Sequence, residues 1–159
     1  MDEHRHIERA CGVLIKMAKS AKNSGVINVG DWDNIIDFIK GFADACHHMK
    51  EEGQLFKMMN ELGMPTENGP IAVMLADHED GRKFVRGMVS AVDKAKTGDK
   101  KAIAAIVENA LGYAGFLPQH ISKEDNILYL MADEMLSDED NTKLLKRYEH
   151  RETEAYLRS

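Results

Sequence analysis

The sequence predicts an all-α protein: an up-down-up-down antiparallel four-helix bundle with a short C-terminal helical tail. Apolar residues recur at spacings of three and four through four long segments, the pattern of helices that bury one face. Alternation typical of strands is nearly absent, and the 159 residues include only three prolines. Turn-forming residues, glycine above all, separate the four segments.

Length, charge and cysteine content narrow the class of protein. We expect one bundle domain at residues 1–136 and a charged amphipathic helix or tail at residues 137–159. The net charge of −6, without a basic cluster, argues against a nucleic-acid partner. No apolar run is long enough to cross a bilayer, and we expect no signal peptide before the first helix. Two cysteines, Cys11 and Cys46, provide no disulfide framework and no zinc motif, so a reducing cytoplasmic location is expected.

The first helix is expected from about Asp2 to Lys22. Asp2 and Glu3 place negative charge at the positive end of the helix dipole. A spacing of three and four aligns its core-facing residues, which are His4, Ile7, Cys11, Leu14 and Ala18. His4 is therefore expected to face the core.

The second helix is expected at residues 31–62, with Asp31 as its N-terminal cap. His47 and Glu51, one turn apart, interrupt its apolar stripe at the middle. A buried carboxylate without a partner costs roughly several kcal/mol. Something must compensate Glu51 if this stripe faces inward.

The third helix is expected at residues 70–96, opening with Pro70 in its first turn. His78 occupies a core position on this helix. Arg82, one turn further along, is expected to pair with a carboxylate.

The fourth helix is expected at residues 99–136, with a kink or local break at Pro118. Its stripe contains His120 and Glu124, at the same four-residue spacing as the pair on the second helix. Each of the four helices therefore carries a histidine on its core face.

These polar positions lie at similar heights along the helices. With about 1.5 Å of rise per residue, His4 lies roughly 27 Å before the first turn and His47 roughly 24 Å after it. His78 lies roughly 27 Å before the third turn and His120 roughly 31 Å after it. Across the second turn, Glu51 and His78 lie roughly 18 Å and 12 Å away. The four positions therefore share one layer of an antiparallel bundle.

Such a layer would place imidazoles and carboxylates together in an apolar core. Helical bundles build carboxylate-bridged dinuclear metal sites in this way. Imidazole and carboxylate ligands suit iron, manganese or zinc. Glutamates from two helices can each bridge two ions, and an open position would admit a small molecule such as dioxygen. The alternatives are solvated His–Glu pairs and a bundle without metal.

The polar segments of the four helices also resemble a known family. The matching segments are Glu3-His4, His47-His48-Met49-Lys50-Glu51-Glu52, Asp77-His78-Glu79-Asp80-Gly81-Arg82 and His120-Ile121-Ser122-Lys123-Glu124. Together they resemble the hemerythrin-like family, in the bacterial and archaeal branch of its HHE cation-binding domain. The resemblance implies a four-helix bundle that holds a non-haem diiron centre.

The resemblance implies a set of metal ligands with terminal histidines and two bridging glutamates. The implied ligands are His4, His47, His48, Glu51, His78, His120 and Glu124. Oxygen-carrying members place two histidines four residues apart on the third helix, where this chain has Met74 and Arg82 beside its single histidine. His48 would either supply the missing ligand or contact the ligands without binding metal itself. Asp125 is the alternative to Glu124, because the oxygen carriers use an aspartate five residues after the last histidine.

By this resemblance, the protein would bind dioxygen or a related small oxidant, for binding, sensing or scavenging. Its cofactor would be two iron ions, with manganese or zinc as alternatives. A diiron oxidoreductase that turns over peroxide or nitric oxide is a second hypothesis, and a non-catalytic iron-binding or sensor module is a third. The expected partners are these small molecules, with no nucleic acid and no membrane, and the chain is expected to be a monomer or weak homo-oligomer.

Overall fold

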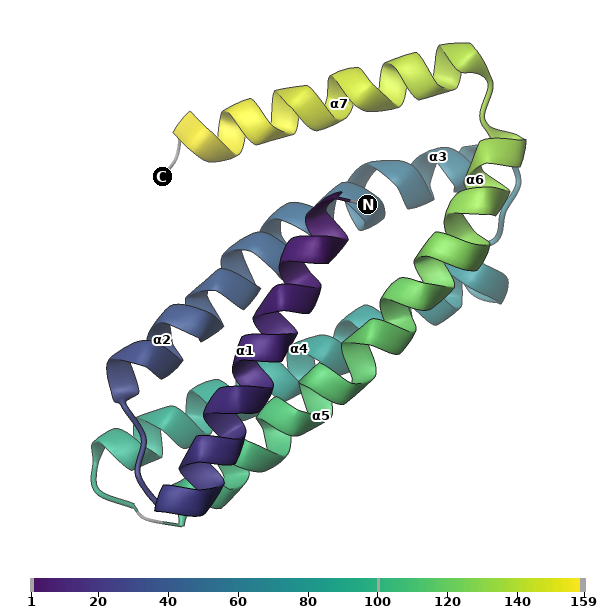
Figure 1. The fold of residues 1–159 in the computed structure, drawn as a ribbon. Coiled ribbons are helices and arrows are strands. Elements are labelled where there is room, and N and C mark those ends of the chain that lie inside the picture. Colours follow the sequence, from purple (N-terminus) through teal and green to yellow (C-terminus); the bar gives the residue numbers. More distant parts are fainter. Residues whose placement is uncertain (1, 100, 158–159) are drawn as a thin grey trace.

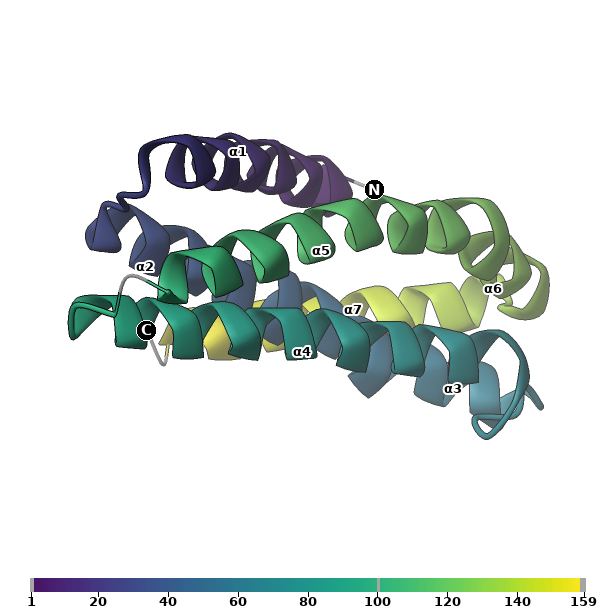
Figure 2. The ribbon, with the colours of Figure 1, turned by 90° about the horizontal axis from the view of Figure 1, so that it is seen from below.

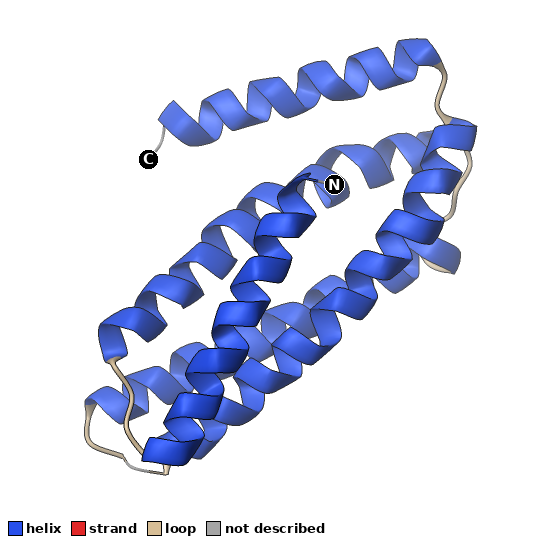
Figure 3. Cartoon of the chain, viewed as in Figure 1, coloured by secondary structure: helices blue, strands red, loops and turns tan. Residues whose placement is uncertain are grey.

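A computed structural model describes residues 2–99 and 101–157, and within these ranges the chain is helical, with no strand (Figure 3). Short connections separate the main helical stretches. The helices of the first half are α1 (Asp2–Ser24), α2 (Val29–Phe38), η1 (Ile39–His48), η2 (Glu51–Leu55) and α3 (Phe56–Glu61). Those of the second half are α4 (Gly69–Lys96), α5 (Ala102–Lys123), η3 (Glu124–Leu128), α6 (Tyr129–Met135) and α7 (Asp138–Leu157). The expectation of an all-helical protein is confirmed.

The second helical stretch begins two residues earlier than expected, and its cap is Asn28 rather than Asp31. The Asn28 backbone is extended, and its side-chain oxygen accepts hydrogen bonds from the backbone N–H groups of Gly30 and Asp31 at 3.0 and 3.4 Å. These bonds satisfy donors that the first turn of a helix leaves free. Asp31 instead lies within the first turn, where its charge suits the helix dipole.

Three segments have π-helical backbone: η1, η2 and η3. A π-helix has i→i+5 hydrogen bonds and more residues in each turn than an α-helix, and it is frequent at functional sites. The rotation about the helix axis from one residue to the next is therefore smaller. This explains how His47 and His48, adjacent in sequence, are both buried, at 5% and 4% exposure.

The expected local break at Pro118 is absent, because α5 continues through this residue. A proline inside a helix removes one backbone hydrogen bond and crowds the preceding turn. The neighbouring Leu117 and Ile121 are buried in the core, and their packing holds this part of the helix in place. The change from α- to π-helical backbone comes later, at Glu124.

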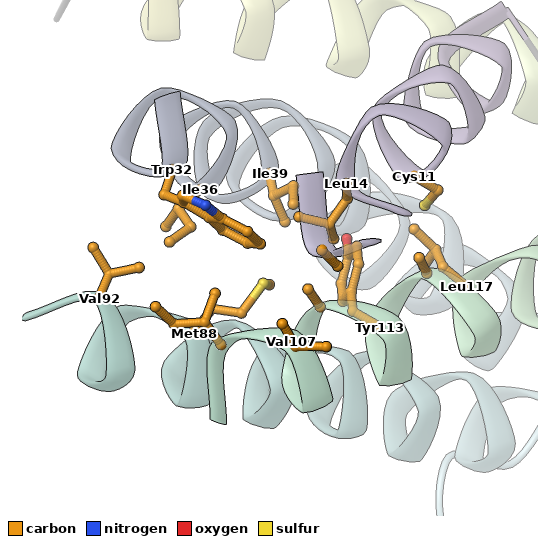
Figure 4. Close-up of a cluster of buried hydrophobic side chains, with 14 of the residues drawn as sticks. Cys11, Leu14, Trp32, Ile36, Ile39, Met88, Val92, Val107, Tyr113 and Leu117 are labelled. Atoms are coloured by element: carbon orange, nitrogen blue, oxygen red, sulfur yellow. The ribbon is translucent and has the colours of Figure 1, made fainter. Parts of the chain in front are cut away.

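The helices pack lengthwise, with α5 between α1 and α4, and α4 also against α2 (Figures 1 and 2). One apolar cluster fills the end of the bundle near Trp32, Met88 and Ile106 (Figure 4). A second cluster, with Phe56 and Ile71, fills the other end. On η1 and α4, the buried histidines fall between the two clusters in chain order, and after α5 the buried Glu124 does so between Ile121 and Leu128. A polar layer therefore separates two apolar cores.

The C-terminal helix α7 lies across one end of the bundle, outside its parallel helices (Figure 1). It contacts η2, and Leu144 is buried in the second apolar cluster at 7% exposure. The next residue, Leu145, is 62% exposed. Among the described residues, no helix combines the length and apolar character needed to span a membrane.

Candidate metal centre

The seven expected ligands all lie in the polar layer, and each is at most 5% exposed. The five imidazoles come from α1, η1, α4 and α5, and the two carboxylates open η2 and η3. Three groups of these side chains bring their ligand atoms within 4.8 Å of one another. The groups are His4 with His47 and Glu124, His48 with His78 and His120, and Glu51 with His78 and Glu124.

The first group lies between α1 and η1. The Nε2 atoms of His4 and His47 are 3.1 Å apart, and His4 Nε2 is 3.2 Å from Glu124 Oε2. The same carboxylate oxygen is 4.0 Å from His47 Nε2. Two atoms bound to one ion at about 2.1 Å lie roughly 3–3.5 Å apart. The shorter separations match that spacing.

The second group lies between η1, α4 and α5. The His48 and His78 rings stack with centroids 4.0 Å apart, and the His120 ring stands edge-on to both. His120 Nε2 is 2.8 Å from Glu124 Oε1, and His78 Nε2 is 3.5 Å from the same oxygen. Two of the three imidazoles therefore lie close to one carboxylate oxygen, Glu124 Oε1.

Glu124 and Glu51 lie between the two groups. Glu124 directs one oxygen toward each group, through the contacts given above. Glu51 Oε2 is 3.6 Å from His47 Nε2 and 3.4 Å from His78 Nε2, so it also faces both groups. This is the placement of carboxylates that bridge two ions.

Five buried polar atoms in this layer have no hydrogen-bond partner among the described residues. They are Glu51 Oε2, His78 Nε2, His120 Nε2 and both carboxylate oxygens of Glu124. Their close approaches to one another lack the alignment of hydrogen bonds. Unsatisfied buried polar atoms cost free energy and are rare in native proteins. These atoms belong to a nitrogen and oxygen donor set, and cations placed between them would satisfy all five.

A carboxylate accepts a hydrogen bond from the Nδ1 side of every one of the five histidines. The pairs are His4 with Asp125 at 2.9 Å, His47 with Glu3 at 3.0 Å, His48 with Asp44 at 3.4 Å, His78 with Glu52 at 2.7 Å and His120 with Asp77 at 3.3 Å. Such bonds place the proton on Nδ1 and leave the Nε2 lone pair free, which is how metal-binding histidines are oriented.

Basic residues hold these outer carboxylates in turn. Lys50 donates to Glu3 and Lys123 donates to Asp77, each at 2.5 Å. Arg82 pairs with Asp44 at 2.8 Å and with Glu52 at 2.7 Å, which confirms the expected carboxylate partner of this arginine. These basic side chains compensate the negative charge of the outer carboxylates and fix their orientation.

The protonation of the imidazoles differs across the layer. Burial lowers the pKa of His48 to about 4, so this ring is neutral and ready to bind a cation at neutral pH. Burial also opposes protonation of His78, but the nearby carboxylates of Glu124, Glu51 and Glu52 prevail and raise its pKa to about 10. In Glu124 itself, burial is outweighed by the imidazoles of His120, His4 and His78, which hold the carboxyl pKa well below its ordinary value.

The two alternatives for the last carboxylate lie in different environments. Glu124 is fully buried and faces both histidine groups. Asp125 is 32% exposed and contacts the outer nitrogen of His4. Tyr129 also lines the layer: its hydroxyl donates to Glu51 Oε1 at 2.7 Å and its ring stacks on His4.

Three of these outer carboxylates, Glu3, Asp44 and Asp77, were not predicted to pair with a histidine. Glu3 and Asp77 directly precede histidines of the layer, and Asp44 lies one helical turn before His48. These spacings were available as signals. Their meaning depends on which helix lies opposite, because Glu3 and Asp77 each serve a histidine of another helix.

A cavity of about 450 Å³ lies beneath α7 and reaches the first histidine group. His47, Glu51 and Tyr129 line its inner side, and Leu144 and Tyr148 of α7 line its outer side. The cavity therefore connects the polar layer with the C-terminal helix.

The fold and the donor set together define a cation-binding helical bundle. A comparison with protein families matches residues 1–132 to the hemerythrin HHE cation binding domain. The chain therefore belongs to the hemerythrin HHE cation-binding family, as the sequence resemblance predicts. Searches among curated proteins and among solved structures gave no significant match.

Proposed function

We propose that this protein is a non-haem diiron protein that binds dioxygen or a related small oxidant, on an up-down-up-down four-helix bundle. The observation that carries the proposal is the group of five buried ligand-type atoms without hydrogen-bond partners. Together with the imidazoles around them, they form a nitrogen and oxygen set suited to iron, with manganese and zinc as alternatives. Two ferrous ions held there would supply the electrons that reduce a bound oxidant.

Following the two histidine groups, we propose different ligands for the two ions. His48, His78 and His120 would hold one ion, and His4 and His47 would hold the other. Glu51 and Glu124 would bridge them. The ion of the first group has one imidazole fewer, so a coordination position remains for a small molecule.

The chain leaves space for such a molecule on the side with fewer ligands. The cavity beneath α7 is lined by His47 and Glu51 and is large enough for a small oxidant. Tyr129 holds Glu51 Oε1 and thereby aims the other oxygen, Oε2, at the two histidine groups. Burial raises the pKa of Tyr129, so its hydroxyl stays protonated and remains a hydrogen-bond donor at this cavity.

Absorption spectroscopy under controlled oxygen tests this function. We expect near-ultraviolet bands of a diferric centre in the aerobic protein and a reversible change on deoxygenation. An iron-loaded protein whose spectrum does not respond to dioxygen, peroxide or nitric oxide would contradict oxidant binding and leave an iron-binding role.

The second candidate function is turnover of peroxide or nitric oxide by the same centre. The cavity beneath α7 and the neutral Tyr129 hydroxyl beside Glu51 favour it, because a donor at the open position could assist proton delivery. Consumption of peroxide over many turnovers, lost in His120→Ala and retained in His6→Ala, would establish an enzyme.

A further inference from the structure

A second cavity runs along the opposite side of the polar layer, between the second helical stretch and α4. This groove has a volume of about 780 Å³, which is in the range of sites for organic ligands. It is far larger than dioxygen requires. It extends along α4 from Gly81 to Thr97, a distance of about 24 Å at the rise of an α-helix.

The charges along this groove are unbalanced in favour of cations, although the chain carries a net charge of −6. The two acidic residues in its lining are already paired, Asp44 with Arg82 at 2.8 Å and Asp93 with Lys96 at 3.2 Å. Lys40 and Lys94 also line the groove, and neither has an ion-pair partner within the described ranges. Two uncompensated ammonium groups therefore face one groove.

The middle of the groove is apolar. Ile39 on η1 and Val85 and Val89 on α4 line it beside the lysines. An anion held by the lysines would therefore lie next to an apolar surface.

The inner end of the groove offers an unused hydrogen-bonding group. Tyr113 lines the groove, is 2% exposed, and makes no hydrogen bond to any residue in the part of the chain that the structure describes. Its ring lies near Gly81, and Figure 4 shows it extending from α5 toward Leu14 and Ile39. Its hydroxyl can therefore form a hydrogen bond with a polar group of a ligand in the groove.

We propose that this groove binds an elongated organic carboxylate, with its carboxylate at Lys40 and Lys94, its apolar chain over Ile39, Val85 and Val89, and a hydroxyl or carbonyl group at Tyr113. The inner end also reaches His48, so the bound molecule lies beside the metal centre. The site is built from side chains outside the seven metal ligands, apart from His48. Its existence does not depend on which metal the centre holds.

Calorimetric titration of the purified full-length protein with ω-hydroxydecanoate tests the proposal. We expect saturable binding of one molecule per chain, and weaker binding of decanol, which lacks the anion, and of decyltrimethylammonium, which carries the opposite charge. The double charge reversal Lys40→Glu/Lys94→Glu should weaken binding about tenfold or more, whereas Lys19→Glu on α1, also exposed, should leave it unchanged.

Two further variants test the apolar body and the inner end. Val89→Trp fills the groove and should abolish binding, with folding checked by circular dichroism. Tyr113→Phe should remove the preference for ω-hydroxydecanoate over decanoate. Absence of binding to the unaltered protein, or equal binding by decanol, or unchanged binding in the charge-reversed variant, would overturn the proposal.

Discussion

The Nε2 atoms of His4 and His47 face each other 3.1 Å apart in the buried layer. Each ring has a carboxylate at its other nitrogen, Asp125 for His4 and Glu3 for His47, so each Nδ1 carries the donated proton. Two neutral rings in these tautomers would direct lone pairs at each other, which is repulsive. A cation bound by both nitrogens removes that repulsion, and a proton on one ring is the substitute in the metal-free protein.

Removal of both bridging carboxylates should abolish metal binding. In Glu51→Ala/Glu124→Ala the ions lose the ligands that face both histidine groups, so we expect bound metal to fall to a small fraction of that in the unaltered protein. Elemental analysis measures this loss. The control Glu134→Ala alters an exposed glutamate of α6 and should retain full metal content. Unchanged metal in the double variant would refute the bridging assignment.

Loss of His48 should affect one ion more than the other. His48→Ala removes an imidazole from the group of three, so we expect about one metal ion fewer per chain, while the exposed His6→Ala should have no effect. Met74 lies one turn before His78 and is 3% exposed. Adding Met74→His to His48→Ala should restore part of the lost metal. A full metal complement in His48→Ala would show that His48 is not a metal ligand.

Metal binding should release protons, and its affinity should rise with pH. The pKa of His78 in the metal-free protein is raised from 6.5 to about 10, so the ring is protonated at neutral pH and must lose its proton to bind a cation. Each released proton changes the apparent affinity about tenfold per pH unit. Calorimetry in buffers of different ionisation enthalpy measures this release, and a heat independent of the buffer would contradict it.

The raised pKa of His78 also makes the stability of the metal-free protein depend on pH. A raised pKa means that the folded state binds the proton more tightly than the unfolded state does. The resulting stability is fully present below about pH 6.5 and is lost as the pH rises through about 10. Denaturant unfolding of the metal-free protein across this range measures that loss.

Displacement of α7 should open the cavity above the first histidine group. Burial of a leucine contributes about 1.5–3 kcal/mol, so Leu144→Asp should increase the fraction of open molecules by about ten- to a hundredfold. We expect an external chelator to remove iron correspondingly faster. Leu145→Asp is the matched control: Leu145 is 62% exposed, so its substitution should leave the rate unchanged. Equal rates in the two variants would show that α7 does not cover the entry.

Much of the fold and of the buried layer could be predicted from the sequence. Helix spacing placed His4, His47, His78 and His120 on core faces, and the rise per residue brought them to one height. The π-helical segments were not predictable, because they depend on backbone hydrogen bonds that no residue pattern specifies. In a regular α-helix, His47 and His48 would point in directions about 100° apart, so burial of both could not be predicted.

Which histidine each outer carboxylate contacts could not be predicted from the sequence either. Asp77 precedes His78 in the chain but accepts from His120, and Glu3 precedes His4 but accepts from His47. These pairings depend on the rotation of each helix against its neighbour. Periodicity gives the buried face of one helix, whereas the partner of a residue at its edge requires the packed structure.

Metal content of the full chain, purified without oxygen, tests the central claim most directly. Elemental analysis should find two iron ions per chain, or two ions of manganese or zinc in their place, and both should be lost in Glu51→Ala/Glu124→Ala. A chain that takes up none of these metals after incubation with them, while remaining folded, would contradict a dinuclear centre in this bundle.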